Sequence, residues 1–142
     1  MKVDKYNMNE EGLNRFFGPL EARIMERVWQ TGRASIKEVQ EMLCKEAPIS
    51  FNAVMTVMNR LCEKGHLNRL AKRSRGEVSY YAAVQTKEQF LSEQTKELAN
   101  GLITDFGPLV VNHLIDSLDQ ADPELIERLE QKLHEMRRRN ET

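Results

Sequence analysis

Apolar residues recur at helical spacing in three short stretches in the first half of the chain. The first stretch follows Pro19, which suits the first turn of a helix, and Gly32 ends it. The second and third stretches begin after Ser35 and Ser50, and serine is a favoured N-cap residue. Gly65 closes the third stretch. The pattern therefore predicts three consecutive helices.

The hydrophobic period changes after these helices. Residues 66–71 and 78–83 have the composition of short extended segments, and the Ser-Arg-Gly sequence at 74–76 between them is typical of a turn. This predicts a β-hairpin. Three helices followed by a hairpin is the order of a winged helix-turn-helix, in which the second and third helices form the DNA-reading pair.

The C-terminal part is again helical by pattern, in three pieces. Thr86 predicts the first cap, Gly107-Pro108 a break, and Asp122-Pro123 the start of the last helix. These helices carry more apolar surface than one small winged helix can cover, and such surfaces mark association sites. We therefore expect a mainly α protein with a helical dimerisation arm. The expected dimer contacts are Phe90, Leu98, Leu102, Leu109, Val110, Leu114, Ile115, Leu118, Leu125 and Leu129.

The expected organisation has three parts. Residues 1–17 form an N-terminal arm, 18–85 a winged-helix DNA-binding domain, and 86–142 a helical dimerisation domain. The arm is largely polar, so we expect it to be mobile at its start and docked through Phe16 and Phe17.

Charge distribution supports a nucleic-acid partner. The whole chain carries a net charge of −1, yet residues 50–75 hold six basic side chains and one acidic side chain, a local charge of +5. A cationic surface within a near-neutral protein is typical of DNA binding. The two cysteines form no framework, no run of about 18 apolar residues exists, and the N-terminus lacks an apolar signal region. We expect a cytoplasmic protein without membrane insertion.

Helical spacing separates a polar face of the third helix from its apolar face. Asn52 can pair with adenine, Thr56 can meet a thymine methyl group or a phosphate, and Ala53 and Met55 offer apolar contact. Basic residues in the wing, and Arg33, Ser35 and Lys37 near the second helix, can touch phosphate. The expected DNA contacts are Arg33, Ser35, Ser50, Asn52, Ala53, Met55, Thr56, Asn59, Arg60, Lys72, Arg73 and Arg75.

Each of these features also has a plainer interpretation, as a solvated helix face or an ordinary surface turn. Cys62 and His66 have ligand-like spacing, but Cys62 falls on the apolar face, where a free cysteine behaves as a small hydrophobe. We expect no metal and no cofactor. The chain lacks a Gly-rich phosphate loop, an HExxH motif and a Ser/His/Asp set in motif context, so we expect no enzymatic activity.

The order of elements and several motifs resemble the BlaI/MecI/CopY penicillinase-repressor family of bacterial transcriptional regulators. The matching text is GPLEARIMERVW at 18–29, AVMTVMNRLCEKGHL at 53–67, the YY of the second wing strand and TKEQFL after it. The resemblance covers about residues 18–118. It implies a homodimer whose N-terminal winged helices bind a palindromic operator and whose C-terminal helices interlock. Many members carry a basic residue where Met55 stands, and the chain lacks the paired C-terminal cysteines of the copper-responsive branch.

We therefore expect a homodimeric repressor that binds double-stranded DNA. Its operator would have half-sites about one turn (~10 bp) or a small multiple apart. Two alternatives stay open. One is a MarR-like regulator that senses a small molecule in a pocket between the winged helix and the helical arm. The other is a winged helix that binds proteins rather than DNA. The operator sequence, the inducing signal and a membrane sensor-protease as a partner are left open by the sequence.

Overall fold

The computed structural model of the 142-residue chain describes residues 3 and 5–141. The chain forms two compact units, Met1–Leu91 and Ser92–Thr142. The first residues of the N-terminal arm, which the sequence leads us to expect as mobile, lie largely outside the described residues.

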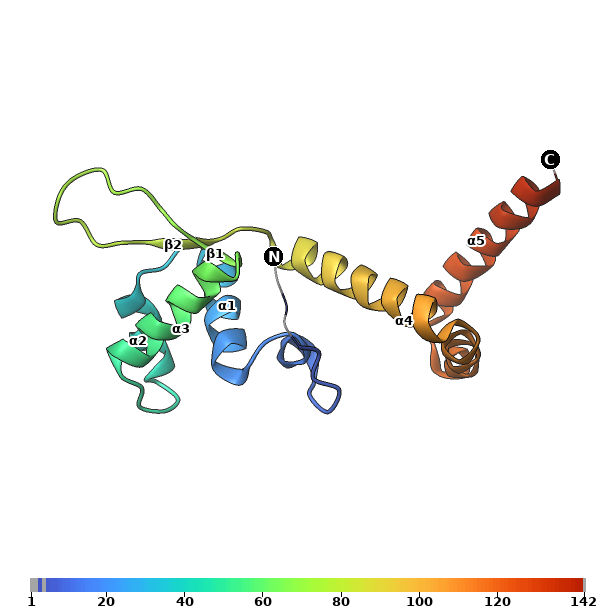
Figure 1. Cartoon of the computed structure of the whole chain (residues 1–142), viewed down its shortest axis with the longest axis horizontal. Helices are drawn as coiled ribbons and strands as arrows, with labels where there is room; N and C mark the ends of the chain where they lie inside the picture. The colour runs from blue at the N-terminus through green and yellow to red at the C-terminus, as the bar shows by residue number, and fades with distance from the viewer. Residues whose placement is uncertain (1–2, 4, 142) are drawn as a thin grey trace. The chain divides into compact units, whose positions relative to one another are not determined.

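The first unit contains a 3-10 turn, three helices and a hairpin. Their order is η1 (Gly12–Arg15), α1 (Pro19–Thr31), α2 (Ile36–Leu43), α3 (Phe51–Glu63), β1 (Leu67–Arg69) and β2 (Tyr81–Ala83), as Figure 1 shows. The predicted order of three helices and a hairpin is confirmed, and the first unit is a winged helix.

Local chemistry explains where these helices begin and end. The Ser35 hydroxyl accepts a hydrogen bond from the Glu38 backbone N–H at 3.1 Å, and the Glu38 carboxylate accepts one from the Ser35 N–H at 3.4 Å. This reciprocal pair is a capping box. Ser50 caps α3 by accepting from the Ala53 N–H at 3.1 Å. After α1, Gly32 adopts φ of +82°, a left-handed conformation that favours glycine.

The core of the first unit lies where the three helices meet the hairpin. α1 packs on α3 and β2, and α3 packs on α2 and β1. The large hydrophobic side chains that are fully buried there are Ile24, Met25, Val28, Val39, Val54, Met58, Leu61, Leu67, Tyr81 and Phe90. Each such side chain contributes roughly 1.5–3 kcal/mol of burial free energy. Packing one face of α3 in this way leaves its opposite face at the surface.

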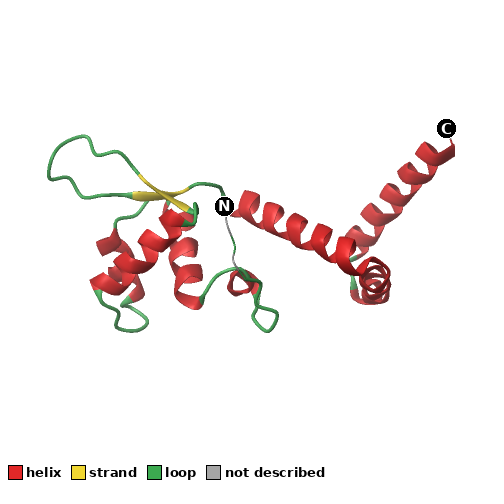
Figure 2. Cartoon of the chain, viewed as in Figure 1, coloured by secondary structure: helices red, strands yellow, loops and turns green. Residues whose placement is uncertain are grey.

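The hairpin is antiparallel, with Leu67 opposite Ala83 and Arg69 opposite Tyr81. Ala34 adds a third backbone segment, because it exchanges two hydrogen bonds with Tyr81, at 3.0 and 2.9 Å. Residues 71–79 lie beyond the paired region and form the long loop between the two yellow strands in Figure 2. This loop is the wing.

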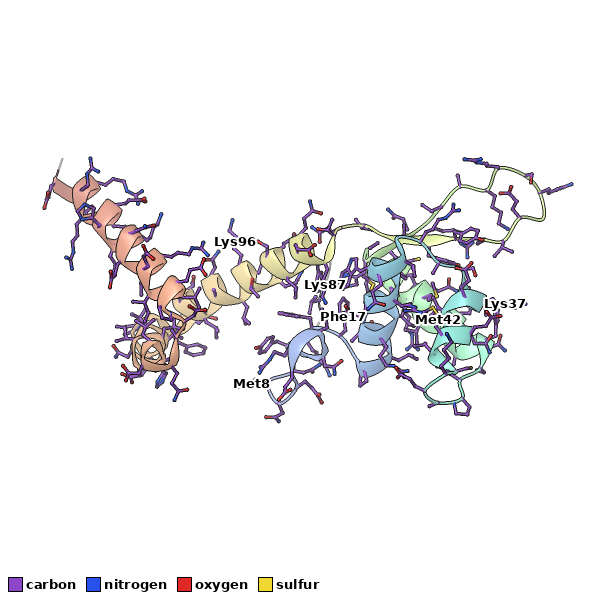
Figure 3. All side chains as sticks on the ribbon, turned by 180° about the vertical axis from the view of Figure 1, so that it is seen from behind. Met8, Phe17, Lys37, Met42, Lys87 and Lys96 are labelled. Carbon is purple, nitrogen blue, oxygen red and sulfur yellow. The ribbon has the colours of Figure 1, made fainter. Side chains whose placement is uncertain are left out.

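The N-terminal arm docks through its phenylalanine pair, as predicted. Phe17 is buried and stacks on Phe90, with ring centroids 5.0 Å apart, and Phe16 meets the same ring edge-on at 6.0 Å. Figure 3 labels Phe17, between the arm and α1. Phe90 is among the residues expected at a dimer surface, yet it is fully buried in this aromatic cluster. It therefore has no surface left to offer a second chain.

The remaining elements are α4 (Lys87–Ser117), η2 (Leu118–Gln120) and α5 (Pro123–Glu141). Thr86 caps α4 by accepting from the Gln89 N–H at 3.1 Å, and Asp122 accepts from the Glu124 N–H at 3.0 Å at the start of α5. α4 is two helical pieces that meet at Phe106, where φ is −132° and ψ is 19°. The expected break falls here because the proline that follows at 108 lacks an N–H and crowds the preceding turn.

The second unit buries little of its apolar surface. No apolar side chain is buried within residues 92–141, all of which the structure describes. Its exposed large side chains are Leu102, Ile103, Phe106, Leu109, Val111, Leu114, Ile115, Leu125, Leu129, Leu133 and Met136. No helix in the described part of the chain combines the length and apolar character needed to cross a membrane.

Candidate DNA-binding surface

The outer side of α3 carries the residues expected to meet base edges. We call this set the groove face: Asn52, Ala53, Met55, Thr56, Asn59 and Arg60. Asn52, Thr56 and Arg60 are exposed, and the other three are half-buried. The face exists because Val54, Met58 and Leu61 turn the opposite side of the helix into the core.

Thr56 has its hydroxyl committed to the helix itself. Its Oγ1 donates a hydrogen bond to the backbone carbonyl of Asn52 at 2.8 Å, one turn earlier. The hydroxyl proton is therefore used, and the exposed side chain offers a methyl group and an oxygen that can only accept.

The turn before α3 is held by one side chain of α2 and by the residue that caps the C-terminus of α2. Gln40 Nε2 donates to the carbonyl of Ile49 at 3.1 Å, and the Cys44 thiol lies 3.4 Å from the same oxygen. Ile49 also packs against the core. These contacts fix the direction in which α3 leaves the turn, and so the orientation of the groove face relative to α2.

Cations lie on either side of the groove face in the sequence. We call this set the phosphate flank: Arg33 and Lys37 around the start of α2, and Lys72, Arg73 and Arg75 in the wing. All five are exposed. Figure 3 labels Lys37 on α2. Cations placed this way suit backbone phosphates, which position a protein on DNA without reading its sequence.

Ser35 differs from Arg33 and Lys37 because its side chain is buried. It is expected among the phosphate contacts, but only 3% of its surface is exposed and its hydroxyl caps α2. Its role in the structure is to cap α2, and of the three residues expected to contact phosphate near α2, only Arg33 and Lys37 are exposed.

Arg33 is joined to the wing through an aromatic ring. Its guanidinium carbon lies 4.7 Å from the centroid of the Tyr80 ring, a cation–π distance. The two residues border a hollow of about 420 Å³ that Lys72, Arg73 and Glu77 also line. With three cations and one acidic group among its lining side chains, this hollow carries a net positive charge.

The wing tip has an ordered turn. The Glu77 carboxylate accepts a hydrogen bond from the Arg73 backbone N–H at 2.9 Å, and Gly76 has φ of +86°. The glycine permits a left-handed turn that a larger residue would strain. The turn sets where the neighbouring side chain of Arg75 leaves the backbone.

Two other basic residues of the segment 50–75 stabilise the fold. The Arg69 guanidinium donates to the Tyr81 hydroxyl from Nη2 at 2.9 Å, and this hydrogen bond raises the pKa of Arg69 above its ordinary value. The Lys64 ammonium lies 3.3 Å from the Glu21 carboxylate of α1. These two charges therefore help to hold β1 and α3 in place.

The cysteines lie in different environments. Cys44 is exposed, whereas Cys62 packs against the core, where burial raises the pKa of its thiol and the nearby charge of Arg69 opposes that rise. His66 is buried beside the rings of Phe17 and Phe90. Among the described residues, no three His, Cys, Asp or Glu side chains gather in a way that could hold a metal ion.

Two residues of this surface are absent from the sequence-based set. Tyr80 supports Arg33, and the alternation of a strand could have indicated it, because Tyr81 next to it is buried. Phe51, the first residue of α3, has 43% of its surface exposed. Its position directly after the Ser50 cap was the available signal.

The chain matches the family described as "Penicillinase repressor" over residues 17–135. It is similar to the DNA-binding domain of the repressor BlaI, at 23% identity over 55% of this chain and 90% of that one, with a TM-score of 0.43. It is also similar to a mutant of MarR from E. coli in complex with operator DNA, at 14% identity over 84% and 75%, with a TM-score of 0.45. A search of curated proteins found no match.

Proposed function

The chain belongs to the penicillinase repressor family of non-enzymatic transcription regulators and is a DNA-binding winged-helix repressor, and we propose that it acts as a homodimer on an inverted-repeat operator. Each α3 would enter a major groove, and two-fold symmetry would place the half-sites about one helical turn (~10 bp) or a small multiple apart. Repression would follow from occupation of a promoter.

The groove face on α3 is the observation that carries the DNA-binding part of this proposal. Its side chains are short or apolar near the N-terminus of the helix, the end that approaches base edges in helix-turn-helix proteins. The phosphate flank supplies cations from α2 and the wing. Cations on two separate elements around a polar helix face match the division between phosphate contacts, which position a protein on DNA, and base contacts, which specify the sequence.

The exposed apolar surface of the second unit supports a homodimer. Leu109, Leu114 and Ile115 are each more than half exposed, at 63%, 57% and 56%. α5 carries Ile126, Leu129, Leu133 and Met136 at 3-4-3 spacing, the spacing of a coiled-coil seam. A second copy of the chain would supply the same apolar surfaces, against which those of the first copy could pack.

The free energy available from this surface is sufficient for association. Six large apolar side chains on the second piece of α4 and the first residue of η2 could contribute roughly 10 kcal/mol when buried, before the cost of ordering two chains. These residues are Leu109, Val110, Val111, Leu114, Ile115 and Leu118. Dimerisation at cellular concentration would be expected on this basis.

Equilibrium binding to defined DNA tests the proposal. The full chain would first select duplexes from a random-sequence library, and its affinity for a selected inverted repeat would then be compared with that for one half-site. We expect salt-sensitive binding that resists competitor DNA, with two chains per inverted repeat. Absence of any such binding would favour a winged helix that recognises proteins instead.

A hollow in the first unit gives a reason to keep direct sensing of a small molecule as a second candidate. It measures about 530 Å³ and is lined by the end of α1, the exit from β2 and the first turn of α4. Trp29 lines it, with its indole N–H donating to the Gln85 carbonyl at 2.9 Å, and the Lys87–Glu26 ion pair lies at 2.8 Å on its border.

Trp29 makes this second candidate easy to test, because it is the only tryptophan in the chain. A ligand that occupies the hollow should change its fluorescence and release the protein from DNA at the same concentration. If compounds release the protein from DNA without changing the fluorescence of Trp29, any effector site lies elsewhere.

A further inference from the structure

We infer that the groove face reads T·A base pairs through the 5-methyl groups of thymine, so that the half-site of this protein is rich in A·T pairs at the positions that α3 contacts. The inference rests on the proposed function, because it assumes that α3 enters the major groove. It concerns which groups on the base edges are recognised there.

The charge pattern of α3 is the first observation. The residues from Phe51 to Asn59 include no charged side chain, and Arg60 is the first cation of the helix. Guanine is most often recognised by arginine or lysine, which donate to its O6 and N7 atoms. The N-terminal turns of α3 therefore lack the side chains that would read G·C pairs from the guanine edge.

The orientation of Thr56 is the second observation. Because its hydroxyl proton is donated to the Asn52 carbonyl at 2.8 Å, it is not available to a base acceptor or a phosphate oxygen. The residue is exposed, so this position offers a partner its methyl group and an oxygen that can only accept. In the major groove the methyl group that distinguishes thymine is the natural apolar contact for it.

Neighbouring residues extend the same chemistry. Ala53 and Met55 are half-buried, and Phe51 is 43% exposed at the first position of the helix. None of these side chains has a strong donor or acceptor, so each can contribute apolar contact alone. Asn52 is exposed beside them, and its amide can accept a hydrogen bond from adenine N6 and donate one to adenine N7.

Replacing thymine by deoxyuridine tests this directly, because deoxyuridine removes the methyl group and keeps base pairing and the minor-groove edge. The selected inverted repeat would be synthesised with single deoxyuridines at each thymine of one half-site, and the Kd measured for each duplex. Burying one methyl group corresponds to about a four-fold change in Kd, so we expect losses of about that size at two or more positions.

Variants of Thr56 identify the side chain responsible. Thr56→Ser keeps the hydroxyl that bonds the Asn52 carbonyl but removes the methyl group, so it should abolish the preference for thymine over deoxyuridine at one position. Thr56→Val is the matched control, because it keeps a methyl group and removes the hydroxyl. It should retain the preference. Circular dichroism would check that both variants keep the helical content of the wild type.

The outcomes separate this inference from the proposed function. Thymine-dependent losses that Thr56→Ser removes would support it. Equal affinity for thymine and deoxyuridine at every half-site position, or selected half-sites dominated by G·C pairs, would overturn it while leaving sequence-specific DNA binding intact. Binding with no sequence preference would overturn it as well. Failure to bind any duplex would overturn the proposed function itself.

Discussion

Arg33 lies over the ring of Tyr80, with its guanidinium carbon 4.7 Å from the ring centroid. This contact joins the segment between α1 and α2 to the second arm of the wing, two elements separated by more than forty residues in the sequence. The same two elements exchange backbone hydrogen bonds one residue further along, at Ala34 and Tyr81. The wing is therefore tied to the helix-turn-helix by a backbone bridge and by a cation–π contact beside it.

The first prediction concerns this contact. Tyr80→Leu should raise the Kd for all DNA sequences by about two- to five-fold, since exposed cation–π pairs contribute roughly 0.5–1 kcal/mol and the wing cations would be less well placed. Tyr80→Phe keeps the ring and should bind like the wild type. Fluorescence anisotropy with cognate and unrelated duplexes measures both. If Tyr80→Phe were as weak as Tyr80→Leu, the hydroxyl rather than the ring would matter.

The wing tip gives a second prediction. Arg75→Ala should weaken binding to every sequence about equally and reduce the slope of log K against log salt by about 1, because one phosphate contact is lost. Arg128→Ala, which removes the same charge from α5, is the control and should leave the slope unchanged. A loss confined to the cognate sequence would contradict a phosphate role for Arg75.

Much of this architecture could be predicted from the sequence because it follows local rules. Ser35, Ser50 and Thr86 marked helix starts, and each does cap a helix. The same rules could not show that the Ser35 hydroxyl would be consumed by its cap. Nor could they show that Phe90 would turn into the core of the winged helix, since an apolar stripe fits a core and a dimer surface equally well.

Long-range contacts could not be predicted from the sequence, for a related reason. The pairing of Arg33 with Tyr80, and of Arg69 with the Tyr81 hydroxyl, depends on strand register and on which face of the hairpin each residue occupies. The groove face could be predicted from the sequence because helical periodicity alone separates it from the buried face of α3.

The aromatic cluster gives a third prediction. Phe90→Ala should lower the free energy of unfolding by about 3–5 kcal/mol, because Phe90 is fully buried against Phe17 and Trp29 and its removal leaves a cavity. Denaturant unfolding followed by Trp29 fluorescence, at fixed protein concentration, provides the measurement. Val78→Ala, at a position 60% exposed in the wing, should change the same quantity by less than about 0.5 kcal/mol.

The two thiols should differ in reactivity. Burial raises the pKa of Cys62, so at a given pH it has less thiolate, and its rate of reaction with an aromatic disulfide should rise only at higher pH. Cys44 is exposed and should react first. Rates measured against pH on Cys44→Ser and Cys62→Ser, each retaining one thiol, check this order. Equal rates in the two variants would show that Cys62 is more accessible than its position against the core implies.

Dimerisation gives the fifth prediction. Leu114→Asp should yield monomers with a folded winged helix that bind the inverted repeat far more weakly, because a charge cannot be buried cheaply in an apolar interface. Asn112→Asp adds the same charge at an exposed polar position nearby and should remain dimeric. Sedimentation gives the oligomeric state. Wild-type chain that sediments as a monomer at micromolar concentration would remove the basis for a palindromic operator.

A hydroxyl-radical footprint of the full chain on a selected duplex tests the central claim most directly, because it reports where each half of the protein contacts the DNA backbone. The account predicts two sets of protected sugars, related by two-fold symmetry and centred about one helical turn (~10 bp) or a small multiple apart. A single protected segment without symmetry, or no protection under conditions where the protein is folded and dimeric, would contradict it.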